Sequence, residues 1–263
     1  MTTRSLMSPI DDVVIWRTHF ARWTLSQTVH EIDRLIQAGV PSQFITANLH
    51  TLMLADGDPE MKAAMDGAAF VLADGMPIVW AARLKGCRLP ERVAGSDLLP
   101  ALCEHAAQKG YRVFFLGGLP GVGEVAAERL TAKFPDLQIV GIESPPFRPL
   151  NPQEEKELVD RIRAARPHIL FVAISQPKGD IWCYRNRRRV EVPVCVNLGA
   201  SLDFVAGRVR RAPRWMQRVG LEWLHRISRE PLRLTGRYTR NALFLTRMIA
   251  IDLVDYVRGR PAG

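Results

Sequence analysis

Short runs of β-branched and aromatic residues alternate with longer amphipathic stretches along most of the chain. Short apolar runs favour strands, and apolar residues three or four positions apart favour helices. Strands are predicted at residues 13–16, 44–46, 70–72, 113–116, 138–142, 169–173 and 194–197. Helices between them are predicted at residues 25–37, 98–109, 122–134 and 152–166. This order predicts an α/β fold with a mostly parallel sheet and helices on both faces.

The strand pattern stops near residue 204, and two or three helices are expected beyond it. We therefore predict a core at residues 1–204 and a basic helical C-terminal appendage at residues 205–263. Helix breaks are expected at Pro213, Pro231 and Gly236.

One helix of this appendage is predicted over residues 214–229. On a helical projection, Arg214, Arg218, His225 and Arg229 share a narrow arc, and tryptophan and leucine residues share another. Such a helix can lie in a lipid interface with its arginines in water. The alternative is that its apolar side packs on the core.

Composition favours a folded protein in a reducing compartment. The chain has 263 residues, 47% of them hydrophobic, which is enough for a well-buried core. Its four cysteines show no Cys-x-x-Cys spacing, and we expect a cytoplasmic location. Residues 1–10 lack the apolar run of a signal peptide, and Arg247 and Asp252 interrupt the most apolar window of the tail. If the protein meets a membrane, we expect it to lie on the surface.

Positive charge is concentrated in one segment. The net charge is +9, and residues 205–240 contain ten arginines against two glutamates, which gives +8. Such a block favours a polyanionic partner, namely nucleic acid, an anionic lipid surface or a diphosphate. A merely solvated basic face is the alternative. Since no nucleic-acid recognition module is recognisable, no nucleic-acid partner is expected.

Polar and glycine residues follow several predicted strands, where ligands bind in open parallel sheets. Asp74 and Gly75 follow one buried strand, which places a carboxylate on a tight turn where a general base could act. The alternative is that Asp74 caps the next helix. Thr46 and Asn48 could orient a sugar or phosphate, or could simply form a turn.

Two further motifs have competing interpretations. Asp56-Gly57-Asp58 resembles a metal-binding Asp-x-Asp, but Asp58 followed by Pro59 and Glu60 is typical of a helix start. Histidine and cysteine clusters are also absent from the sequence, so no metal site is predicted.

The second motif is Gly121-x-Gly123-x-x-Ala126, with Glu143 downstream, which fits a dinucleotide fingerprint and makes an NAD-dependent oxidoreductase of Rossmann type the alternative function. However, four residues separate the predicted strand from the first glycine of the motif, whereas that glycine normally turns directly off the strand.

Several motifs in one order resemble a known family. They are Thr46-Ala47-Asn48 with His50, Leu72-Ala73-Asp74-Gly75-Met76, residues 91–98 (Glu-Arg-Val-Ala-Gly-Ser-Asp-Leu), Phe115-Leu116-Gly117-Gly118, residues 197–207 (Asn-Leu-Gly-Ala-Ser-Leu-Asp-Phe-Val-Ala-Gly), Arg211-Ala212-Pro213 and Gly220-Leu221-Glu222-Trp223-Leu224. From about residue 11 to 238 the chain is similar to the WecG/TagA/CpsF family of bacterial glycosyltransferases.

The resemblance implies an inverting, metal-independent transferase with a Rossmann-like core and no cofactor. It implies a UDP-sugar donor and an undecaprenyl-diphosphate-linked sugar acceptor, used at the inner face of the cytoplasmic membrane for teichoic acid, enterobacterial common antigen or exopolysaccharide. The catalytic aspartate falls on Asp74 and the active-site threonine on Thr46. The appendage, residues 208–240, would close the site at the membrane. The residues expected to bind substrate are Asn48, Arg92, Gly117, Gly118, Gln176, Lys178, Gly199, Asp203, Arg210, Arg211 and Arg214.

Two departures leave the donor sugar open. The family usually has Pro-Lys-Gln-Glu where this chain has Pro177-Lys178-Gly179-Asp180, so an amide is missing and a carboxylate is shorter. The usual Gly-Tyr-Phe turn is replaced by Ser144-Pro145-Pro146-Phe147. The sequence also leaves open whether the protein is a monomer or a homo-oligomer.

Overall fold

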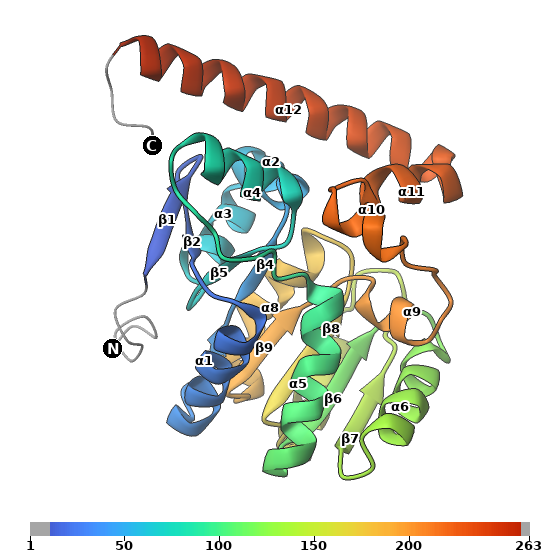
Figure 1. Cartoon of the computed structure of the whole chain (residues 1–263). Coiled ribbons are helices and arrows are strands. Elements are labelled where there is room, and N and C mark those ends of the chain that lie inside the picture. The colour runs from blue at the N-terminus through green and yellow to red at the C-terminus, as the bar shows by residue number, and fades with distance from the viewer. Residues whose placement is uncertain (1–10, 259–263) are drawn as a thin grey trace.

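The computed structural model describes residues 11–258, except for the side chain of Arg233, so the expectation about residues 1–10 lies outside the described residues. A five-stranded parallel sheet has the order β3-β9-β8-β6-β7 (Figure 1). These strands are β3 (Ser42–Gln43), β6 (Arg112–Gly117), β7 (Gln138–Glu143), β8 (Ile169–Ala173) and β9 (Val194–Asn197). The predicted α/β fold is confirmed.

Helices cover both faces of this sheet, because successive side chains of a strand point to opposite faces. Phe115 and Phe171 pack beneath α1 (Leu25–Ala38), α5 (Gly95–Lys109), α6 (Val122–Lys133) and α9 (Ser201–Val205). Their neighbours Phe114 and Leu170 pack beneath α7 (Pro152–Ala165) and α8 (Lys178–Val190) on the opposite face (Figure 1). Two hydrophobic cores therefore hold the five-stranded sheet between its helices.

A second lobe is built from β4 (Ile45–Ala47) and β5 (Val71–Ala73), which pair in parallel, and from the antiparallel hairpin β1 (Asp12–Ile15) and β2 (Thr18–Ala21). Around them lie α2 (Leu49–Gly57), α3 (Pro59–Asp66) and α4 (Met76–Leu84). Only Phe44 separates β3 from β4, so one run of chain belongs to both lobes. Strands β2 and β3 were not predicted from the sequence.

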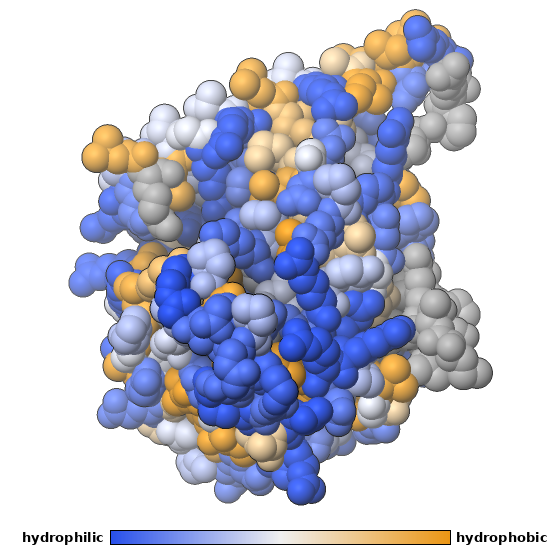
Figure 2. Space-filling view, turned by 180° about the vertical axis from the view of Figure 1, so that it is seen from behind, coloured by the Kyte–Doolittle hydropathy of each residue, from blue (hydrophilic) through white to orange (hydrophobic). Residues whose placement is uncertain are grey.

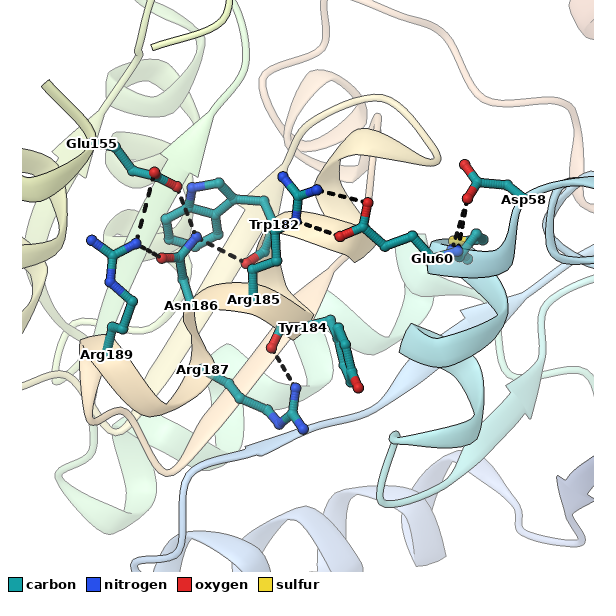
Figure 3. Close-up of polar contacts among 10 residues, drawn as sticks. Asp58, Glu60, Glu155, Trp182, Tyr184, Arg185, Asn186, Arg187 and Arg189 are labelled. Atoms are coloured by element: carbon teal, nitrogen blue, oxygen red, sulfur yellow. Dashed lines mark hydrogen bonds and ion pairs between the residues drawn. The ribbon is translucent and has the colours of Figure 1, made fainter. Parts of the chain in front are cut away.

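Helices α3 and α8 lie against each other and tie the two lobes together (Figure 3). The Arg185 guanidinium forms a bidentate ion pair with the Glu60 carboxylate, with Nη2 2.7 Å from Oε2. The Tyr184 ring lies so close to Gly67 that a Cβ there would be 2.7 Å from Cε2. The Arg187 guanidinium lies over the Tyr184 ring, with Cζ 4.3 Å from the ring centroid. The lobes therefore meet through specific side chains as well as through the shared strand.

The C-terminal segment forms α10 (Arg214–Arg218), α11 (Glu222–Arg229) and α12 (Pro231–Val257). The prediction of one helix over 214–229 is wrong, and so is the shared arginine arc that it required. Gly220 interrupts the helix with φ +76°, and a Cβ there would lie 2.6 Å from the Trp80 ring. The predicted break at Gly236 is also wrong, because α12 runs through it.

Helix α12 lies across the second lobe (Figure 1). Its Phe244 and Met248 side chains are buried in the core of that lobe. Near its end, the Asp252 carboxylate accepts hydrogen bonds from Trp16 Nε1 at 2.9 Å and from Lys85 Nζ at 2.7 Å. The C-terminal segment is thus packed on the core, and a domain boundary near residue 204 stays a prediction. No helix within residues 11–258 combines the length and the apolar character needed to cross a membrane.

If α12 is held by its buried face, Phe244→Ala should lower the free energy of unfolding by about 3–5 kcal/mol. Leu243→Ala is the matched control, because Leu243 is 67% exposed whereas Phe244 is 8% exposed. It should change stability by less than about 0.5 kcal/mol. Denaturant unfolding of both variants measures the difference, and equal effects would contradict this packing of α12.

Candidate active site

A cavity of about 1240 Å³ lies between the carboxyl ends of the strands and the C-terminal helices. Its floor comes from the loops after β4, β5, β6, β8 and β9, as expected for an open parallel sheet. Its other wall comes from α11 and α12. The structure brings together in this cavity the following predicted site residues: Thr46, Asn48, Asp74, Arg92, Gly118, Gln176, Gly199, Asp203 and Arg210.

Asp74 follows β5 directly, is half-buried and lines the floor of the cavity. Its carboxylate does not cap α4, since the N-cap there is Gly75 and makes no side-chain cap. Instead, Oδ2 accepts a hydrogen bond from the Gly95 N–H at 3.3 Å. Desolvation raises the pKa of Asp74 to about 7, although Arg92 and the Gly95 N–H act in the opposite direction. A carboxylate with this pKa can accept a proton near neutral pH.

Thr46 and Asn48 flank Asp74 but are used differently. Thr46 is buried, and its hydroxyl lies near Gly95 and Ser201 at the cavity floor, within 3.4 Å of where a Gly95 Cβ would be. The Asn48 side-chain oxygen accepts hydrogen bonds from the backbone of His50 at 3.0 Å and Thr51 at 3.3 Å, so it caps α2. The side-chain oxygen of Asn48 thus forms a turn, as the alternative interpretation predicted. Asn48 also lines the cavity.

Arg92 and Arg211 both form ion pairs with carboxylates. Arg92 Nη1 lies 2.9 Å from Glu222 Oε2 and Nη2 lies 3.8 Å from Asp97 Oδ2. Arg211 makes a bidentate pair with Asp97, with Nη2 2.7 Å from Oδ2, and its Nε lies 3.6 Å from Glu222 Oε1. We call these four residues the charge ring. It joins the core to the C-terminal segment, and Arg211 does not line the cavity.

The remaining predicted residues lie beside the cavity. Gly117 ends β6 with φ +103°, and a Cβ there would be 2.7 Å from the Ala173 carbonyl oxygen, so its role in the structure is close packing. Lys178 begins α8 and is exposed outside the lining. Arg214 lines a neighbouring recess of about 410 Å³ together with Arg218 and Arg92. A direct role of these residues in substrate binding stays a prediction.

The C-terminal wall contains three arginines of the basic segment that were not among the residues expected to bind substrate. Arg226, Arg229 and Arg237 line the cavity. The buried Nε of Arg226 has no hydrogen-bond partner among residues 11–258. His50 Nδ1 lies 3.0 Å from Asn241 Oδ1. Burial, and then the positive charge of Arg237 and Arg240, lower the pKa of His50 to about 4. This end of the cavity therefore has a positive potential.

Comparisons with known proteins agree with this arrangement. A family model described as the glycosyl transferase WecG/TagA/CpsF family matches residues 13–256. A relative from Bacillus spizizenii, an N-acetylglucosaminyldiphosphoundecaprenol N-acetyl-beta-D-mannosaminyltransferase, is 34% identical over 189 residues, which cover 72% of each chain.

The chain belongs to the WecG/TagA/CpsF family of glycosyltransferases. The resemblance stated from the motifs is confirmed, and so is the assignment as a glycosyltransferase. The motif Gly220-Leu221-Glu222-Trp223-Leu224 supplies Glu222 of the charge ring, and Glu222 and Trp223 both line the cavity. That motif was the available signal for these two residues, although it did not indicate their partners.

Membership in a glycosyltransferase family removes the basis for the oxidoreductase alternative. Gly121, Gly123 and Glu143 are not among the residues that line the cavity. Gly123 is needed for packing, because a Cβ there would lie 2.5 Å from Ile142 Cγ2. Glu143 instead pairs with Arg161, with Oε1 2.6 Å from Nε.

The Asp56-Gly57-Asp58 triplet also has a structural role in this family member. Asp58 Oδ1 accepts hydrogen bonds from the Glu60 N–H at 2.9 Å and the Met61 N–H at 3.2 Å, which confirms the predicted helix cap. Asp56 Oδ2 lies 2.6 Å from Arg247 Nη1 of α12. Both carboxylates are thus used in holding helices.

The departure at Gly179-Asp180 from the family pattern has a counterpart on β9. A Cβ at Gly179 would lie 2.5 Å from Asn197 Cγ and Nδ2, so the Asn197 amide fills the space that a side chain at 179 would take. Asn197 Nδ2 donates to Asp180 Oδ2 at 3.0 Å. Its Oδ1 accepts from the backbone of Ile174 and Gly199, both at 3.3 Å. The Asn197 amide therefore occupies the space beside Gly179, and it joins two loops of the cavity floor.

Since Gly179 and Asn197 share one space, Gly179→Ala should cost about 1–3 kcal/mol of folding free energy. The same change in an Asn197→Gly background should lose most of that cost, because the clashing amide is gone. Gly57→Ala is the control, as nothing lies within 4 Å of a Cβ there. A double-mutant cycle from denaturant unfolding tests this, and additive single effects would show that the two positions do not compete.

Proposed function

We propose that the protein transfers a hexose or N-acetylhexosamine from a UDP-sugar to an undecaprenyl-diphosphate-linked sugar, with inversion and without a metal ion. The observation that carries the proposal is Asp74, a half-buried carboxylate in a cavity walled by the arginines of the C-terminal segment. The name of the Bacillus spizizenii relative supports the acceptor, since it includes an undecaprenyl-linked N-acetylglucosaminyl diphosphate. The same name makes N-acetylmannosamine the first donor sugar to test.

In this mechanism Asp74 is the general base. The acceptor hydroxyl gives its proton to a carboxylate oxygen of Asp74 as its own oxygen attacks the anomeric carbon. The bond from that carbon to the UDP oxygen breaks on the opposite face, so the configuration inverts and UDP leaves. The pKa of about 7 supports this role, because the deprotonated group is abundant at neutral pH and still has appreciable proton affinity. Thr46, at the adjacent floor, would orient the reacting sugar.

The diphosphates would be held by arginine rather than by a metal ion. Arg226, Arg229 and Arg237 approach the cavity from one side, and Arg210 approaches from the segment after α9. Guanidinium groups bind phosphate oxygens through charge-assisted, often bidentate hydrogen bonds. The unpartnered Nε of Arg226 and the positive potential at His50 support an anion at this end. Glycines with positive φ, Gly118 and Gly199, bring backbone close to the opposite end, where we place the UDP group.

We also propose that the C-terminal helices rest on the inner face of the cytoplasmic membrane. Trp215, Trp223 and Leu224 are exposed beside the arginines of α10 and α11. On the distal half of α12, hydrophobic side chains gather at the upper edge of the molecule (Figure 2). Those exposed by 40% or more are Leu253, Val254, Tyr256, Val257, Ile249 and Ile251. Arginines attract anionic lipid and apolar side chains enter the interface, so both terms favour binding.

The proposed reaction predicts a defined defect in Asp74→Asn. Transfer from UDP-N-acetylmannosamine, or another UDP-sugar, to a lipid-linked N-acetylglucosamine acceptor should fall by about 10² to 10⁴, while UDP still raises the melting temperature. Excess EDTA should leave wild-type transfer intact. Near-normal turnover of the variant would remove Asp74 from the mechanism, and a strict requirement for Mn²⁺ or Mg²⁺ would contradict metal independence.

The arginines that line the cavity from the C-terminal segment should affect sugar transfer more than membrane binding. Replacing Arg226 and Arg237 together by glutamine should lower kcat/KM for the lipid-linked acceptor by about 10²- to 10⁴-fold, because charge-assisted hydrogen bonds contribute about 1.5–3 kcal/mol each. Arg240→Gln, one turn from Arg237 but outside the cavity lining, is the matched control. All variants should still sediment with anionic vesicles, less so at high salt. Equal losses of transfer in Arg240→Gln and the double variant would contradict the assignment.

A further inference from the structure

Glu222 contacts the charged groups around Asp74 from the C-terminal segment. It is the first residue of α11, lines the cavity, and its side chain is 20% exposed. Its carboxylate pairs with Arg92 and approaches Arg211, so it forms the C-terminal half of the charge ring together with Arg211. A carboxylate in a cavity proposed for anionic substrates needs an explanation, because it repels the phosphates that the cavity would bind.

Glu222 controls which carboxylate Arg92 pairs with. The Arg92 side chain is only 15% exposed, so water screens its charge weakly, and its charge acts directly on Asp74. An arginine that is free to pair with Asp74 would stabilise the carboxylate form and make it a poor proton acceptor. Glu222 holds Arg92 Nη1 at 2.9 Å and supplies a compensating negative charge near the same site.

We propose that Glu222 is a positioning residue that keeps Arg92 paired away from Asp74, so that Asp74 remains an effective base. This inference rests on the proposed function, in which Asp74 accepts the acceptor proton. It makes the base dependent on a residue from the segment that would meet the membrane-bound acceptor.

The groups facing Asp74 come from four parts of the chain. Arg92 precedes α5, Gly95 donates its N–H from the first residue of α5, Arg211 lies between α9 and α10, and Glu222 begins α11. Arg92, Gly95 and Arg211 all lower the pKa of Asp74, whereas burial and Glu222 raise it. Glu222 is therefore the one charged side chain in this set whose removal should shift Asp74 toward stronger acidity.

The test is a ¹³C NMR titration of the Asp74 carboxyl group in the full-length protein without substrate, with the resonance assigned from Asp74→Asn. In wild type the midpoint should lie near 7. In Glu222→Gln it should fall by about one pH unit, since the amide keeps the shape of the side chain but not its charge. Glu230→Gln is the matched control: Glu230 also lines the cavity from the C-terminal segment but is not among the groups acting on Asp74.

The readout separates this inference from the proposed function, because it needs no transfer reaction. If wild type transfers sugar but the Asp74 midpoint in folded Glu222→Gln equals that of wild type, or rises, Glu222 is only a structural anchor and the inference fails. If Glu222→Gln does not fold, Glu222→Asp decides the question. Its shorter side chain should draw the charge back from Arg92 and lower the midpoint by a smaller amount, and an unchanged midpoint there would equally overturn the proposal.

Discussion

Four side chains of alternating charge hold the C-terminal segment against the core, and the candidate site depends on them. Arg92 and Asp97 come from the core, and Arg211 and Glu222 come from the segment that follows it. Without this charge ring, α11 would lose its ion pair with Arg92, whereas α12 would still be held by the buried side chains of Phe244 and Met248. Because each arginine meets carboxylates in a partly desolvated place, removing one member leaves an unbalanced charge beside Asp74.

The sequence predicted the fold because short apolar runs and helical patterns alternate clearly from residue 25 to 197, and parallel strands place their carboxyl ends together. That rule also brought Thr46, Asp74, Gly118 and Gly199 to one cavity. The hairpin turn at Trp16 and Arg17 escaped prediction, because both residues have positive φ without the usual glycine or asparagine. The break at Gly220 escaped as well, and the close approach of Trp80, far away in sequence, could not be predicted from the motif.

The roles of the arginines were the least predictable part of the site. Charge counting identified a basic segment, and its arginines differ only in where the folded chain puts them. Arg211 is paired with Asp97, whereas Arg226 on α11 and Arg237 on α12 line the cavity. The contact between Gly179 and Asn197 has the same lesson: the space beside Gly179 of α8 is filled by an amide from β9. Such pairings depend on tertiary distances, which single-sequence motifs do not contain.

The central claim is that Asp74 removes the acceptor proton from a site where burial raises its pKa. The most direct measurement is the single-turnover rate of sugar transfer as a function of pH, at saturating donor and lipid-linked acceptor. Below its pKa the carboxyl group is protonated and cannot act as a base, so the rate should rise with pH through a midpoint near 7 and then level off. A rate that stays constant from about pH 5 to 9, with chemistry shown to be rate-limiting, would contradict the account.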